Sequence, residues 1–159
     1  MRNSLKLALA LVAIGAGIAS TAGAQTSGSI NATATVLSAL SVTGTNLAFG
    51  NIAPTQTKTV AAPAGGTFNV AGANSAPVAV SFTLPGTLGT NVAIGTWTGL
   101  SNTANNSGTA AALAVSGAAQ NLSLSGTGQL FVWVGATLTT TGATPGAYSA
   151  PVTMTVVYN

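Results

Sequence analysis

The sequence predicts an all-β protein, and three observations support this prediction. Thr, Val, Ser, Gly and Ala dominate the composition, and hydrophobic residues alternate with polar ones in several runs, as they do in half-buried strands. The 159 residues include three basic residues and no Asp or Glu, so no segment has the charged face of an amphipathic helix. Clusters of Gly, Pro and Asn separate the runs, which favours a sandwich or a Greek-key barrel.

Four runs give the clearest strand predictions. Two of them each place four apolar side chains on one face, namely Ile30, Ala32, Ala34 and Val36 in the run 29–36, and Val152, Met154, Val156 and Tyr158 in the run 151–158. The run 78–84 alternates in the same way, whereas 129–134 is apolar on both faces, as in a central strand. Shorter strands are predicted at residues 47–52, 59–62, 67–71, 92–97, 111–115 and 122–125.

Residues 1–24 have the layout of a secretory signal peptide. Residues 1–6 form a short basic region, and residues 7–19 form an apolar region. Residues 20–24 are mostly small, and Ala22 and Ala24 form an A-x-A arrangement. The apolar run is shorter than the ~20 residues that a membrane-spanning helix needs, which argues against a membrane anchor. We therefore expect cleavage between Ala24 and Gln25, export through the periplasm, and no membrane span in the remaining chain.

Beyond this leader the sequence has one charged side chain, Lys58, and the whole chain has no Asp, Glu, His or Cys. Acid–base catalysis, thiol chemistry and most metal sites depend on those residue types, and no Ser has a base for a Ser-His-Asp arrangement. The sequence therefore predicts a protein that is not an enzyme, with no catalytic residues, no cofactor and no metal. Without a patch of Lys or Arg, nucleic-acid binding is not expected either.

The same composition predicts a stability that barely depends on pH. Stability changes with pH only through groups whose proton binding changes on folding, and beyond the leader these are Lys58, Tyr148, Tyr158 and the chain ends. We expect the melting temperature to stay nearly constant from strongly acidic to mildly alkaline pH, with little effect of salt. A melting temperature that falls steeply between about pH 5 and pH 3 contradicts this expectation.

Trp97, Phe131 and Trp133 are candidates for carbohydrate binding, because aromatic rings can stack on the faces of sugars. Beyond the leader, no Asp, Glu or Arg is available beside them to bind hydroxyl groups. Packing in a core or between subunits is the better explanation for these rings. A monomeric secreted carbohydrate-binding or adhesive module is the alternative function that the sequence leaves open.

Several short motifs resemble, in their order along the chain, those of the DUF4402 family. The segments 34–43 (ATVLSALSVT) and 47–54 (LAFGNIAP) resemble its opening strands, in which "A-x-V…pL-x-I" precedes "L-x-F-G-x-I". The middle and closing motifs are GTFNV at 66–70, AVSFTLP at 79–85, VGATL at 134–138, PGAY at 145–148 and VTMTVVY at 152–158. Ala48 stands where the family more commonly has an acidic residue.

The family is similar to spore coat U proteins and to archaic chaperone–usher pilins, which are immunoglobulin-like sandwiches that polymerise into surface fibres. The resemblance implies an immunoglobulin-like antiparallel β-sandwich at residues 41–159, preceded by an N-terminal strand at 25–40. It also implies a structural subunit of a pilus-like or fimbria-like extracellular fibre, or of a surface coat, that polymerises by strand donation. The partners would be further copies of the chain, with a periplasmic chaperone and an outer-membrane usher. Unlike its pilin relatives, this chain has no disulfide.

The segment 25–40 allows two interpretations. An immunoglobulin-like domain that lacks one strand leaves unpaired backbone and exposed core, which a neighbour's strand can cover with main-chain hydrogen bonds and alternating side chains. The apolar face of 29–36 fits such a donor strand, and the apolar face of 151–158 is the predicted flank of the acceptor groove. The same segment could instead be the first strand of its own sheet, and the sequence leaves both interpretations open.

Overall fold

The computed structural model describes residues 26–159. The predicted signal peptide and the cleavage site between Ala24 and Gln25 lie outside the described residues. The chain divides into one unit that ends at Ala34 and a second unit, Thr35–Asn159, which contains all the described strands. Residues 26–40 belong to no strand or helix.

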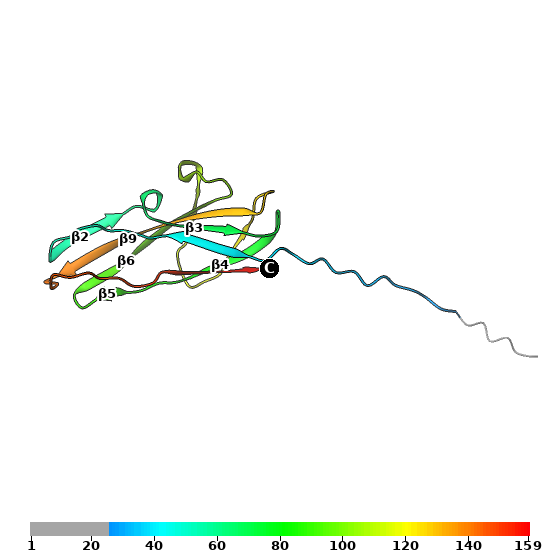
Figure 1. Ribbon diagram of the computed structural model, residues 1–159, viewed down its shortest axis with the longest axis horizontal. Helices are drawn as coiled ribbons and strands as arrows, with labels where there is room; N and C mark the ends of the chain where they lie inside the picture. Colours follow the sequence, from blue (N-terminus) through cyan, green and yellow to red (C-terminus); the bar gives the residue numbers. More distant parts are fainter. Residues whose placement is uncertain (1–25) are drawn as a thin grey trace, which may run out of the picture. The chain divides into compact units, whose positions relative to one another are not determined.

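Two antiparallel sheets form a sandwich, so the predicted all-β fold class is confirmed (Figure 1). The larger sheet has seven strands: β1 (Ser41–Thr45), β2 (Thr55–Val60), β3 (Gly66–Ala71), β5 (Thr87–Gly89), β6 (Val92–Asn102), β7 (Ala111–Leu113) and β9 (Gln129–Thr141). The smaller sheet has three strands in the order β10 (Thr153–Tyr158), β4 (Pro77–Thr83) and β8 (Gln120–Ser123). Two short 3-10 turns, η1 (Ala62–Ala64) and η2 (Ser107–Thr109), lie in the connections.

β9 is the long central strand of the larger sheet (Figure 1). On one side its first half pairs with β3 and its second half with β2, and on the other side it pairs with β6. Its inward side chains from Leu130 to Thr140 are buried at every second position. The sequence prediction ended this strand at Val134, where the run that is apolar on both faces ends. Threonine is β-branched and suits a pleated strand, so the strand continues to Thr141.

The smaller sheet covers one half of the inner face of the larger sheet. There the two sheets share a hydrophobic cluster of eleven buried residues: Val70, Ala76, Val78, Val80, Phe82, Leu113, Leu124, Leu130, Val132, Val134 and Met154. Val78 and Val80 of β4 and Val70 and Val132 of the larger sheet are fully buried. Since each such side chain stabilises the fold by about 1.5–3 kcal/mol, this closed half accounts for much of the stability.

The other half of the inner face has no second sheet above it. It carries a separate cluster, which consists of Phe49, Val92, Ile94, Ala136, Leu138 and Ala143. Two irregular segments, 46–54 and 143–152, contribute to this cluster in place of strands. The sandwich is therefore double-layered over one half and incomplete over the other.

Several strand predictions were wrong in an informative way. The runs 29–36 and 47–52 were predicted as strands but belong to none, so 29–36 is not the first strand of its own sheet. β1 and β5 were missed, and the predicted strand 111–115 ends at Leu113. A strand needs a partner for its backbone N–H and C=O groups, and the period of the side chains does not reveal whether one exists.

Candidate functional site

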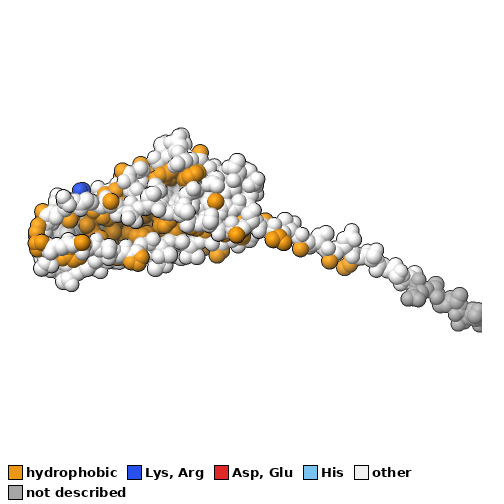
Figure 2. Space-filling view, viewed as in Figure 1, with side chains coloured by type: hydrophobic (Ala, Val, Ile, Leu, Met, Phe, Trp, Pro, Cys, Tyr) orange, Lys and Arg blue, Asp and Glu red, His pale blue; other side chains and the backbone are white. Residues whose placement is uncertain are grey.

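An open groove of about 930 Å³ lies over the incomplete half of the sandwich. Its floor is the inner face of the larger sheet, and its two borders are the irregular segments 46–54 and 143–152. Figure 2 shows hydrophobic side chains gathered in a band along this part of the molecule. This groove is the candidate functional site.

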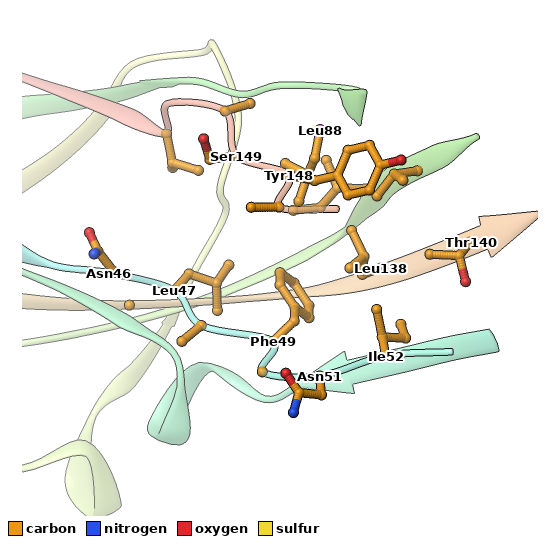
Figure 3. A pocket seen from close by; sticks show the side chains of 18 of the residues that line it. Asn46, Leu47, Phe49, Asn51, Ile52, Leu88, Leu138, Thr140, Tyr148 and Ser149 are labelled. Atoms are coloured by element: carbon orange, nitrogen blue, oxygen red, sulfur yellow. The ribbon is translucent and has the colours of Figure 1, made fainter. Parts of the chain in front are cut away.

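Four side chains from the two longest strands form much of the floor. Val92 and Ile94 extend from β6, and Leu138 and Thr140 extend from β9, where Ile94 is paired with Leu138 and Val92 with Thr140. Figure 3 shows Leu138 between the two borders and Thr140 further along β9, whereas Leu88 of β5 lies beside Tyr148. The register of three strands thus builds an apolar floor with one hydroxyl near its end.

The first border, residues 46–54, is held down by side chains and not by backbone pairing. Thr140 Oγ1 donates to Ala53 O over 2.8 Å and accepts from Gln56 N over 2.9 Å. Gln56 Oε1 accepts from Ala53 N over 2.9 Å, and the Phe49 ring is buried among the floor residues. Within the described part of the chain, residues 46–52 form no backbone–backbone hydrogen bond. This border therefore presents unpaired N–H and C=O groups.

The second border, residues 143–152, is held in place by Tyr148. The Tyr148 hydroxyl donates to Thr144 O over 2.7 Å, and the ring packs on Gly89 of β5, where an added Cβ would come within 2.7 Å of ring atom Cδ1. Among the described residues, 145–152 also make no backbone–backbone hydrogen bond. Both borders are thus fixed in position, while residues 46–52 and 145–152 form no backbone–backbone hydrogen bond.

One hydrogen bond ties the two borders together, in which Ala143 N donates to Pro54 O over 3.0 Å. Outside both borders, Tyr158 Oη donates to Ser38 O over 2.7 Å and accepts from Ala73 N over 2.6 Å. The result is an elongated slot with unpaired backbone along both sides, which is what an added strand requires.

The structure places the predicted acceptor residues only partly at this groove. Val152 lines it, whereas Met154, Val156 and Tyr158 pack against the cluster of the closed half. The reason is that β10 pairs with β4, so its apolar face is already used between the two sheets. The flank of the groove is the segment just before β10, not β10 itself.

The predicted donor residues are exposed. Ile30 is 97 % exposed and Val36 is 94 % exposed, and Ala32 and Ala34 are exposed as well. An alternating apolar face that none of residues 26–159 covers is unusual, because such residues ordinarily pack in a sheet. The structure therefore contains both an unfilled groove and an unpartnered strand-like segment.

Sequence reasoning missed the residues that shape the groove most, Phe49, Ile94, Leu138 and Tyr148. The available signals were the L-x-F alternation at 47–49 and the PG-x-Y motif at 145–148. They were interpreted as a paired strand and as a turn. The structure shows that both segments line the same groove and that both lack backbone partners. Neither property can be read from the local sequence.

Two further residues that the sequence singled out, Lys58 and Trp133, do not line the groove. Lys58 lies on β2, which pairs only with β9, and its Nζ is 3.5 Å from Asn51 O. Trp133 is 6 % exposed and stacks on Phe131 with ring centroids 6.3 Å apart, so its ring has no free face for a sugar. In residues 26–159 no helix is long and apolar enough to cross a membrane.

The comparisons with known proteins give one match. A family model described as a domain of unknown function (DUF4402) matches residues 40–158, which is more than half of the chain. Neither the curated proteins nor the solved structures contain a match. The matched range begins one residue before β1 and ends with β10, so it coincides with the sandwich.

Proposed function

The chain belongs to the DUF4402 family, and we propose that it is a secreted structural subunit of an extracellular fibre or surface coat. In this proposal the segment 29–36 of one copy occupies the groove of the next copy as a donated strand. The observation that carries the proposal is the incomplete half of the sandwich, where two borders with unpaired backbone enclose an apolar floor. An extended segment bound in the groove would pair with the backbone of the borders and would also cover the apolar floor.

The segment and the two unpaired borders have similar numbers of residues. Eight extended residues span about 26 Å, and the unpaired borders are the similar stretches 46–52 and 145–152. A donated strand would form main-chain hydrogen bonds with both borders, each with a net contribution of about 0.5–1.5 kcal/mol. Its apolar face would meanwhile cover the floor, which adds hydrophobic stabilisation in proportion to the area buried.

The position of the groove favours chains of subunits over closed dimers. Ser38 is bound near the start of β1, whereas the groove is lined by Gly44 and Thr45 at the end of that strand. A segment that leaves at one end and an acceptor at the other make a head-to-tail contact, which propagates as an open filament when the rotation does not close. With Lys58 as the one charged side chain beyond the leader, the contact would be apolar and hydrogen-bonded and not ionic.

Free subunits would be prone to uncontrolled pairing before assembly. Runs such as 129–134 and 154–158 combine high β-propensity, high hydrophobicity and no charge. In our proposal a periplasmic chaperone therefore shields the subunit during export, and an outer-membrane usher releases it at the cell surface.

The test uses the chain that begins at Gln25. We expect it to form filaments in negative-stain electron microscopy and a light-scattering signal that grows with concentration. A free peptide of residues 28–37 in excess should cap the grooves and stop growth. The matched control is the same peptide with Ile30→Asn and Val36→Asn, which keeps the backbone but loses both large apolar side chains. A chain that stays monomeric at high concentration contradicts the proposal, as do filaments that grow equally well with either peptide.

A further inference from the structure

β2 is an edge strand of the larger sheet, and one of its two sides has no partner. It pairs with β9 along all six residues, Thr55–Val60, and with no other described strand. In residues 26–159, no backbone–backbone hydrogen bond outside this ladder reaches residues 55–60. A free edge of this kind is a template to which a strand of another chain can add. The three threonines and the valine of β2 also favour strand pairing.

The one charged side chain beyond the leader lies on this edge strand. Lys58 is directly opposite Leu138 of β9, which is buried on the inner face, and side chains of directly opposite residues lie on the same face of a sheet. Lys58 is partly buried. Its Nζ is 3.5 Å from Asn51 O and 3.6 Å from the place of a Cβ on Gly50. The ammonium group therefore lies on the inner side of the edge strand, beside the first border.

The outer face of β2 would not oppose the addition of a strand. Thr57 and Thr59 are exposed, and their hydroxyls form hydrogen bonds with those of Thr139 and Thr137 over 3.2 and 2.9 Å. Such side chains would stay in contact with water if another strand were added beside β2. Lys58 is the residue of this strand that combines a charge with an inward position.

A strand added to this edge would cover part of the Lys58 side chain. Burial of an ammonium group costs free energy unless an anion pairs with it. A second copy of the chain has no Asp or Glu, so it has no carboxylate side chain to offer. The residues that line the groove include no charged side chain. A strand of a second copy would thus bury a charge at β2 but none in the groove.

We propose that Lys58 keeps the strands of other copies away from the free edge of β2 and thereby confines pairing between copies to the groove. The strand that it excludes is an uncharged extended segment of a second copy, such as residues 29–36. Lys58 lies outside the groove, so this role goes beyond the proposed function. It makes one side chain a determinant of where the chain pairs, through a contact that is made unfavourable.

The experiment follows light scattering of the chain that begins at Gln25, with an excess of the peptide of residues 28–37 to cap the grooves. Lys58→Thr should aggregate despite the peptide, and the concentration at which these aggregates appear should be lower than for the parent by about ten-fold or more. Lys58→Gln should behave in the same way, because it also lacks the charge. Lys58→Arg should behave like the parent. Each variant must keep the circular dichroism spectrum of the parent.

The matched control moves the charge without changing the net charge. A chain with Lys58→Thr and Asn105→Lys carries its lysine in the exposed loop between β6 and η2. We expect this chain to aggregate like Lys58→Thr. If it stays as soluble as the parent, net charge alone prevents aggregation and the inference fails.

The outcomes separate this inference from the proposed function. If the peptide keeps Lys58→Thr as soluble as the parent, the edge of β2 needs no protection and the inference is wrong, while strand donation stands. If the parent does not assemble without the peptide but Lys58→Thr aggregates, the proposed function fails and the role of Lys58 is supported.

Discussion

Removal of residues 25–36 is expected to abolish polymers completely and to leave the sandwich folded. The deleted residues that the structure describes belong to no strand or helix, and Ile30 and Val36 are almost fully exposed. The free energy of unfolding should therefore change by no more than about 0.5 kcal/mol, as for other surface changes. Sedimentation and electron microscopy would measure assembly, and circular dichroism with thermal melting would measure the fold.

The matched control is the removal of residues 25–28 alone, which shortens the chain but keeps the alternating face that begins at Ile30. This shorter deletion should still assemble. Polymers that persist after the longer deletion would exclude strand donation by this segment. A longer deletion that unfolds the protein would show that the segment completes its own domain.

The second large effect is expected at Gly135, in the middle of β9. A Cβ at this position would overlap with Val60 O and Ala62 N, which are backbone atoms and cannot rotate away. We expect Gly135→Ala to lower the free energy of unfolding by about 3 kcal/mol, at the upper end of typical overpacking. In a domain of this size that corresponds to a decrease in melting temperature of about 10 °C.

Gly95→Ala in the paired strand β6 is the control for this prediction. Nothing lies within 4 Å of a Cβ at Gly95, so the substitution should be neutral, or stabilising by up to about 1 kcal/mol, because glycine weakens strand interiors. Thermal and denaturant unfolding of both variants would measure the difference. Equal stability of the two variants would contradict the close approach of β9 to the segment 60–62.

The strands that were predicted most clearly have a side-chain pattern that fits only one arrangement of buried and exposed faces. β4 alternates strictly and β9 is apolar on both faces in its first half, so each has a side-chain pattern that only one burial arrangement satisfies. The detached segment 29–36 has an equally clear pattern. Periodicity therefore identified the sequences that can pair, but it did not distinguish those that pair within the chain.

The groove depended on contacts between residues far apart in the sequence. The run 47–52 was predicted as a strand, yet it belongs to none, and its Phe49 packs on the floor of the groove instead. Tyr148 had the signature of a turn at PG-x-Y, and its role as a border residue follows from its contact with Gly89, which is distant in sequence. Neither role could be inferred from neighbouring residues.

The sequence by itself determined which ionisable residue types the chain lacks, the all-β class, and the alternating face that begins at Ile30, because these depend on residue types and their local period. Only the tertiary structure decided that the second layer covers half of the sandwich, that β10 belongs to the closed half, and that Phe49 and Tyr148 line the open half. The physical reason is that a strand exists through its backbone partners, and which segments find partners is settled by the packing of the whole domain.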